Sequence, residues 1–150
     1  MGEIDLPDKA YNPRRRQYRG GPLLDMLCGY RNRETGRVLG LVEGDCYVES
    51  LNFVFGLATR GGREALIALP RLRAGIAGRR PDPKTIDNRI LKEALHELGH
   101  NWGLDHCNNP DCVMRFSLTL AEVDEKSSSF CKQCAVKRES KILERDGNTA

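Results

Sequence analysis

The sequence has little of what marks membrane, secreted or nucleic-acid-binding proteins. No apolar run approaches the roughly 20 residues that a membrane span needs. The N-terminus has neither the basic start nor the apolar stretch of a secretory signal, so we expect a cytoplasmic protein. Aromatic residues are 6% of the chain and the formal net charge is only +3, which argues against a nucleic-acid partner.

Histidine is also scarce, and its placement is the most informative feature of the chain. All 3 histidines lie in the segment HELGHNWGLDH, residues 96–106. On a helix, His96 and His100 would project from one side, one turn apart, within reach of a single zinc ion. Gly103 can adopt the left-handed conformation that ends a helix, which would let His106 return as a third ligand.

Three protein ligands leave the fourth zinc position to water, as in catalytic rather than structural sites. Glu97 follows the first ligand directly and is the candidate general base and acid. The apolar residues of the predicted helix, from Ile86 to Trp102, fall on one arc of about 180°. Both helical histidines lie outside that arc, so we expect them off the packing face.

Four of the 6 cysteines have the spacing of a second metal site. A chain without an export signal favours reduced thiols, and hence metal binding over disulfides, which are the alternative. A C-x4-C…C-x2-C set predicts a closed, structural zinc bound by four thiolates. Its members are Cys107, Cys112, Cys131 and Cys134.

The two remaining cysteines, Cys28 and Cys46, sit among apolar residues and are predicted to be buried, reduced thiols. Because Cys107 directly follows His106, the thiolate site should fix the loop that presents the third histidine.

These motifs resemble the archaemetzincins, a family of metzincin zinc metallopeptidases. HELGHNWGLDH, the cysteines after it and Met114 carry the resemblance, and residues 12–18 and 51–57 read like the family's N-terminal half. The resemblance implies an α+β fold: a compact metzincin-like domain with a small mixed sheet, an edge strand above the zinc cleft, a central active-site helix and C-terminal helices. It also implies that Met114 forms a hydrophobic floor beneath the histidines, with a plain core methionine as the alternative. Family members usually begin with a further strand and helix, so that unit is expected to be absent here or removed.

By its size the chain is predicted to be one domain over residues 1–150. Residues 1–104 would form the sheet and active-site helix, and residues 105–150 a C-terminal subdomain around the structural zinc. A short helix is expected over residues 23–27, an interior strand over 38–42 and another strand within 51–58. Residues 64–69, ended by Pro70, are a candidate for the edge strand that pairs with substrate, and an ordinary core strand is the alternative.

Several local signals complete the expected architecture. Residues 7–19 should be an extended lead-in whose arginines are either solvated or contact a partner. Residues 70–83 should form a surface loop, after which Asp82 caps the main helix and Pro83 opens it. Thr119 and Glu122 form a capping-box pattern for a short helix, and residues 131–145 suggest a tail helix.

The residues together predict a monomeric zinc-dependent metallopeptidase with two zinc ions per chain and peptide or protein substrates. Either endopeptidase or aminopeptidase action is compatible with the motif, and no tyrosine can be assigned to transition-state stabilisation. The first alternative is a non-catalytic zinc protein that binds peptides or partners through the same cleft. The second is a zinc-stabilised nucleic-acid binder, which the low net charge and scarce aromatic residues disfavour.

Overall fold

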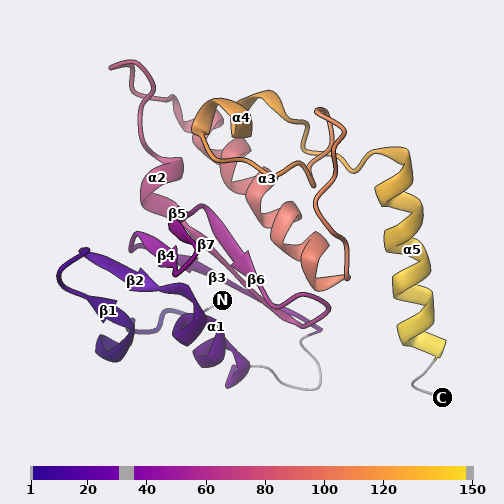
Figure 1. Cartoon of the computed structure of the whole chain (residues 1–150), viewed down its shortest axis with the longest axis horizontal. Coiled ribbons are helices and arrows are strands. Elements are labelled where there is room, and N and C mark those ends of the chain that lie inside the picture. Colours follow the sequence, from indigo (N-terminus) through magenta and orange to yellow (C-terminus); the bar gives the residue numbers. More distant parts are fainter. Residues whose placement is uncertain (1, 31–35, 148–150) are drawn as a thin grey trace.

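The computed structural model describes residues 2–30 and 36–147, and it is an α+β protein, as predicted. Figure 1 shows two small sheets beside one long helix, α3 (Pro83–Asn101). No helix in the described ranges combines the length and apolar character that crossing a bilayer requires. The other helices are η1 (Asp8–Ala10), α1 (Gly20–Cys28), α2 (Leu69–Leu72), α4 (Leu120–Glu125) and α5 (Lys132–Gly147).

Both sheets mix parallel and antiparallel pairs. One has the strand order β1-β2-β4-β5 and the other the order β3-β7-β6, so β7 is central in the second sheet. The strands are β1 (Tyr11–Asn12), β2 (Gln17–Arg19), β3 (Val38–Val42), β4 (Cys46–Val48), β5 (Leu51–Val54), β6 (Gly56–Ala58) and β7 (Glu64–Ala68).

The strand at β7 is a core strand, so the proposal that residues 64–69 form the substrate-binding edge is wrong. All five of its residues are buried, and α1 and α3 both contact it. A short continuous apolar run is typical of a strand covered on both faces, and the nearby arginines lie beyond its ends. The segment over residues 38–42, expected to be interior, is instead the edge strand β3.

The apolar run at residues 51–58 forms two strands rather than one. β5 pairs with β4 in the first sheet, whereas β6 pairs with β7 in the second. Between them lies Phe55, whose carbonyl oxygen accepts a hydrogen bond from the Ala68 amide at 2.8 Å. The chain therefore changes sheets at Phe55, and β6 becomes the edge strand that faces the cleft described below.

The N-terminal lead-in is a hairpin of β1 and β2 rather than a purely extended segment. Two of its arginines bind their own chain. Arg15 stacks 4.1 Å from the Tyr47 ring centre, and Arg19 donates to the Lys9 carbonyl at 2.9 Å. The arginines at positions 14 and 16 are exposed, in keeping with a solvated strip.

The two cysteines outside the predicted metal site differ in burial. Cys46 is fully buried, and burial raises the pKa of its thiol to about 12. Cys28 is exposed, which corrects the expectation that both are buried. It lies in the last turn of α1, where the neighbouring Leu27 takes the core position.

Helix α3 begins as predicted, with the Asp82 carboxylate accepting a hydrogen bond from the Thr85 amide at 2.9 Å. Its buried face, however, is largely polar, and the expected apolar packing arc is only partly covered; Leu91 is 48% exposed. Buried polar groups need partners, and the surrounding elements supply them. Arg89 makes a bidentate pair with Asp124 at 2.7 Å, for example. The buried polar residues of the helix are Arg89, Glu93, His96, Glu97 and Asn101.

The C-terminal part forms the two helices that the sequence predicts. The reciprocal capping box of Thr119 and Glu122 is present at the start of α4. Figure 1 shows α5 at the edge of the molecule, and a groove lined by Trp102 and Lys141 separates it from the end of α3. Val136 and Leu143 on α5 are exposed.

Candidate metal centre and cleft

The three histidines converge as predicted. His96 and His100 lie one turn apart on α3, and the helix ends just before Gly103, whose φ of +88° is left-handed. The Gly103 amide donates to the His100 carbonyl at 2.9 Å, and the chain then turns back to His106. One ring nitrogen from each histidine can be chosen so that all three lie within 4.8 Å of one another.

Backbone carbonyls orient the two helical imidazoles. Nδ1 of His96 lies 2.8 Å from the Val113 carbonyl oxygen, and Nδ1 of His100 lies 2.9 Å from that of Leu104. Because a carbonyl only accepts, each Nδ1 must donate, which leaves a lone pair on each Nε2. The two Nε2 atoms are 3.1 Å apart, and two facing lone pairs at that distance favour a shared cation.

Burial is the main cause that lowers the pKa of all three histidines, and it acts most strongly on His96. The imidazoles are therefore held neutral, which is the form that binds a metal. The donor set and its orientation fit a zinc ion, whose ligands in catalytic sites are often histidine nitrogens.

Glu97 lies against the edge strand β6. A Cβ added to Gly56 would lie 2.6 Å from the Glu97 carboxylate, so only glycine leaves room for it. Burial, and next the charge of Glu93, raise the pKa of Glu97 well above its usual range, whereas Lys126 acts in the opposite direction. Sequence reasoning missed Gly56, although a glycine inside a strand signals a close approach.

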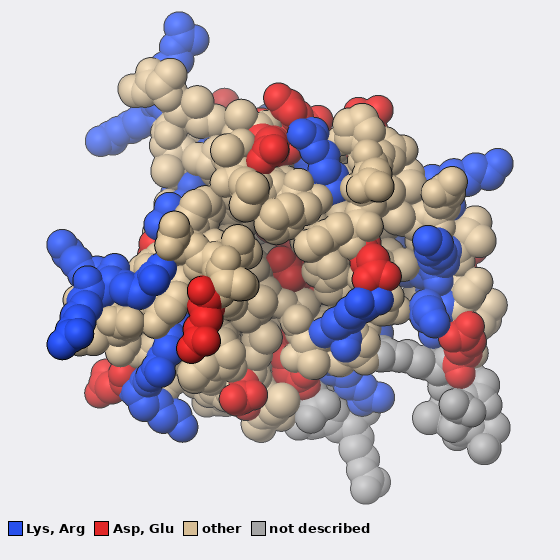
Figure 2. All heavy atoms as spheres, viewed as in Figure 1, with Lys and Arg blue, Asp and Glu red and all other residues tan. Residues whose placement is uncertain are grey.

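A cleft of about 440 Å³ opens beside Glu97 and the histidines. Figure 2 shows this face of the molecule hollowed near its centre, with acidic atoms visible in the hollow. Its lining includes the exposed ion pair between Arg60 and Asp105, at 2.6 Å, and the apolar side chains of Phe53 and Leu118. The described residues that line the cleft include no tyrosine.

Met114 packs against α3 at Gly99, which lies between the two helical histidines in the sequence. It is fully buried, and a Cβ added to Gly99 would collide with its sulfur. Its carbonyl oxygen accepts a hydrogen bond from the Cys107 amide at 2.9 Å. The position is compatible both with a floor for the histidine cluster and with a core methionine.

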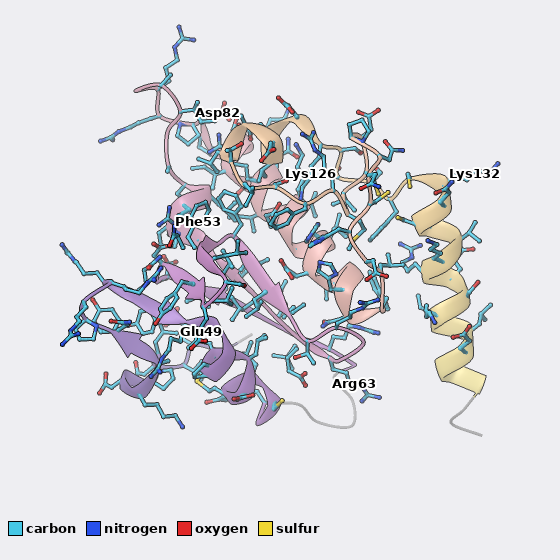
Figure 3. The ribbon with its side chains drawn as sticks, in the orientation of Figure 1. Glu49, Phe53, Arg63, Asp82, Lys126 and Lys132 are labelled. Atoms are coloured by element: carbon cyan, nitrogen blue, oxygen red, sulfur yellow. The ribbon has the colours of Figure 1, made fainter. Side chains whose placement is uncertain are left out.

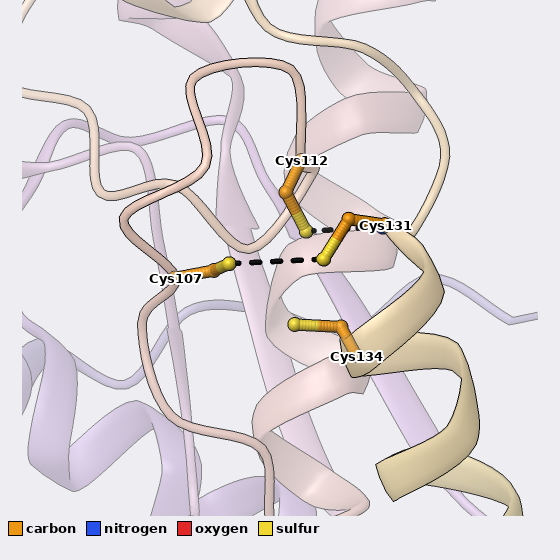
Figure 4. A group of neighbouring side chains, drawn as sticks. All are labelled: Cys107, Cys112, Cys131 and Cys134. Carbon is orange, nitrogen blue, oxygen red and sulfur yellow. Dashed lines mark hydrogen bonds between the residues drawn. The ribbon is translucent and has the colours of Figure 1, made fainter.

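The four cysteines predicted to bind the second metal also converge, as Figure 4 shows. Their sulfur atoms lie within 4.8 Å of one another, and Cys107 and Cys131 are 3.8 Å apart. A disulfide would need about 2.05 Å, so these thiols are reduced and the disulfide alternative fails. A closed group of four sulfurs fits a tetrahedral zinc.

Backbone amides favour a thiolate in this cluster. The Cys134 amide is the main cause that lowers the pKa of Cys131 to about 7. Burial instead raises the pKa of Cys112 and Cys134. A thiolate at Cys131 is the form that binds metal ions.

Lys126 is a buried residue near the cleft that sequence reasoning missed. Figure 3 places it between α3 and α4. Its side chain is fully buried, and its Nζ lies 2.8 Å from Glu93 Oε1 and donates to the Arg115 carbonyl at 3.2 Å. A lysine just after a short polar helix gives no sequence signal of burial, because lysine is almost always exposed.

Comparisons with known proteins agree with this geometry. A sequence model of peptidase family M54 matches residues 3–140. Archaemetzincin of Methanopyrus kandleri is 48% identical over 129 residues, which are 86% of this chain and 70% of that protein. The crystal structure of archaemetzincin from the same organism aligns with a TM-score of 0.84 and 45% identity over 92% of this chain and 73% of that one. A zinc-dependent peptidase from Methanocorpusculum labreanum aligns with a TM-score of 0.82 and 30% identity, over 92% and 83% of the two chains.

Proposed function

Because this chain belongs to peptidase family M54, the archaemetzincins, a family of zinc metallopeptidases, we propose that it hydrolyses peptide bonds with Glu97 as general base and acid. His96, His100 and His106 would hold the catalytic zinc. The observation that carries the proposal is a cluster of three imidazoles beside a buried carboxylate, all in the lining of one cleft.

A zinc ion at this site would polarise the scissile carbonyl and acidify the attacking water. Glu97 would take up the proton of that water and then pass it to the leaving amine. Burial, which raises the pKa of Glu97, suits a group that must accept a proton and release it again. The two backbone carbonyls that receive Nδ1–H would keep the helical imidazoles in one tautomer through this cycle.

The edge strand β6 is the element on which we place the substrate backbone. The Phe55 carbonyl and the Thr59 amide both bond to the β7 side. Antiparallel hydrogen bonding alternates along a strand, so the amides and carbonyls of Gly56 and Ala58 point to the other edge, toward the cleft. An extended peptide can add there as a further strand, with main-chain hydrogen bonds that need no particular side chain.

The cysteine cluster would hold a second, structural zinc and organise residues 105–150 as a C-terminal subdomain. The Cys107 amide bonds to the Met114 carbonyl, and the Val113 amide bonds to the Ser129 carbonyl at 2.9 Å. These bonds connect the loop that carries His106 to the segment that leads into Cys131. The zinc ion held by the four thiolates would thereby support the catalytic site without taking part in the reaction.

The test compares the parent with a Glu97→Ala variant, each loaded with zinc. We expect both proteins to carry two zinc ions per chain by mass-spectrometric metal analysis. In a digest of a peptide library read by mass spectrometry, only the parent should cleave, with a loss of at least about 100-fold in the variant. A chelator should stop the parent.

Two results would contradict the proposal. A Glu97→Ala variant that cleaves as fast as the parent would show that Glu97 is not the general base. A parent with two zinc ions that binds peptides but never cleaves them would favour the non-catalytic alternative. The first bond cut in each peptide also distinguishes endopeptidase from aminopeptidase action.

A further inference from the structure

The third histidine of the cluster is held differently from the other two. His96 and His100 each have a backbone carbonyl oxygen beside Nδ1, whereas neither ring nitrogen of His106 has a hydrogen-bond partner within residues 2–30 and 36–147. His106 also lies beyond the end of the helix and is exposed. An exposed side chain without a hydrogen bond keeps its rotational freedom, which it must lose when it binds a metal ion. A preformed site therefore needs another contact to orient this imidazole.

Phe116 makes that contact. The centres of the Phe116 and His106 rings are 4.8 Å apart, with 38° between the two planes. Aromatic rings attract one another at separations of about 4.5–7 Å. The other two rings against His106 belong to His96 and His100, which are candidate ligands of the same ion. Among the described residues, Phe116 is therefore the only aromatic neighbour of His106 that is not itself a candidate ligand.

Core packing does not account for a phenylalanine at this position. Phe116 is 42% exposed in the lining of the cleft, whereas Met114, two residues earlier, is fully buried. An apolar side chain stabilises the fold in proportion to the area that it removes from water, so Phe116 contributes only part of what a buried phenylalanine would. Its ring contact with a candidate zinc ligand is the feature that sets it apart.

The backbone on both sides of Phe116 is fixed. The Arg115 carbonyl oxygen accepts a hydrogen bond from Nζ of the fully buried Lys126 at 3.2 Å. The Leu118 amide donates to Oε2 of Glu122 at 2.7 Å, next to the capping box of α4. These two bonds tie the segment to the start and the end of α4. The segment therefore presents the phenylalanine ring to the imidazole from a backbone that is itself held in place.

We propose that Phe116 is a positioning residue, which holds the His106 imidazole in the orientation needed for a third zinc ligand. The inference rests on the proposed zinc site at the three histidines. Contact with the Phe116 ring restricts the orientations open to His106 before the ion arrives, so binding costs less conformational entropy. The contact requires a flat ring, because an aliphatic side chain lacks the π-system that aromatic pairs use. Phe116 itself supplies no ligand atom and moves no proton.

The test measures zinc affinity. Competition with a chelator of known affinity reports the histidine site, with His100→Ala as the baseline for the cysteine site. In Phe116→Leu we expect the affinity at the histidines to fall about 2- to 10-fold, the size of one aromatic contact. Phe116→Trp restores a flat ring without adding a metal-binding oxygen and should recover most of the lost affinity. Leu118→Ala, in the same cleft lining, is the matched control and should keep the parental affinity.

A kinetic measurement separates positioning from substrate contact. At saturating zinc the ion itself fixes His106, so kcat/KM of Phe116→Leu should approach the parental value. A raised KM that persists at saturating zinc, with parental affinity for the ion, would assign Phe116 to substrate binding and overturn the inference. An equal loss of affinity in Phe116→Leu and Phe116→Trp would also overturn it, because the flat ring would then make no difference.

The affinity result is independent of the proposed function. A loss in Phe116→Leu that Phe116→Trp recovers supports the inference even if the parent never cleaves a peptide, a result that would overturn only the proposed function. Cleavage by the parent, together with parental zinc affinity in Phe116→Leu, overturns the inference and leaves the peptidase. A parent that binds no zinc at the histidines overturns both.

Discussion

The histidine cluster and the cysteine cluster are separated by a single peptide bond, between His106 and Cys107, yet their surroundings differ. The histidine cluster opens to a cleft and has a buried carboxylate beside it. The cysteine cluster supplies four ligands of one type, with Cys112 and Cys134 buried and no carboxylate among them. Four protein ligands close a zinc site, whereas three leave room for reaction. The comparison teaches that the proposed division into a catalytic and a structural site rests on ligand number and surroundings rather than on position in the chain.

The largest effect is expected from breaking the buried ion pair between Lys126 and Glu93, which lies on the side of the histidine cluster. Lys126→Met would leave Glu93 buried without its partner, and breaking such a pair costs about 3–5 kcal/mol. We expect the free energy of unfolding, from denaturant titration of the zinc-loaded protein, to fall by that amount. The double variant Lys126→Met with Glu93→Gln should recover part of the loss. If the single variant is as stable as the parent, the pair has no role in holding α3 to α4.

Gly56→Ala should lower activity at the histidine site and leave the cysteine site unchanged. The added Cβ, 2.6 Å from the Glu97 carboxylate, must displace either the carboxylate or β6. A shift of about 1 Å can cost on the order of 100-fold in rate, so we expect that loss in kcat/KM with the zinc count unchanged. Gly21→Ala, where nothing lies within 4 Å of the new atom, is the control. A fully active Gly56→Ala would show that the position of Glu97 does not limit the reaction.

We expect the cysteine site to affect zinc binding at the histidine site, but not the reverse. Replacing Cys131 and Cys134 by serine should weaken zinc binding at the histidines by about 10- to 100-fold, because supporting residues affect affinity by that factor. Competition with a chelator of known affinity measures the change. Replacing His100 by alanine should leave the cysteine site loaded. Unchanged affinity at the histidines after the cysteine replacements would make the two sites independent.

The smallest effect is expected at the rim of the cleft. The Arg60 and Asp105 side chains are 63% and 69% exposed, and exposed ion pairs contribute about 0–1 kcal/mol. Arg60→Ala should therefore change the free energy of unfolding by less than about 1 kcal/mol. A larger loss in denaturant titration would mean that the rim, like the floor of the cleft, supports the fold.

Sequence patterns predicted both clusters because each depends on spacing along a short segment. A helix places residues four apart on one side, and Gly103 permits the turn that returns His106. The capping residues Asp82 and Thr119 were likewise readable, since a cap acts within three residues of itself.

Long-range placement was not readable in the same way. The apolar run of β7 was compatible with an edge or a centre, and only its pairing with both β3 and β6 decides for the centre. The partners of the buried polar face of α3 come from other segments, and Lys126, the partner of Glu93, is more than 30 residues away from it in the sequence. Periodicity records what one segment would bury by itself, and it carries no information about the charge that a distant segment brings to it.

The sequence by itself determined the two sets of candidate metal ligands, the candidate base Glu97 and the family to which the chain belongs. Only the tertiary structure decided that β6 is the strand facing the cleft, that Gly56 makes room for Glu97, and that Lys126 pairs with the buried Glu93. The physical reason is range: helix geometry and turns are fixed by neighbours in the chain, whereas the shape and polarity of a cleft are fixed by which elements pack together.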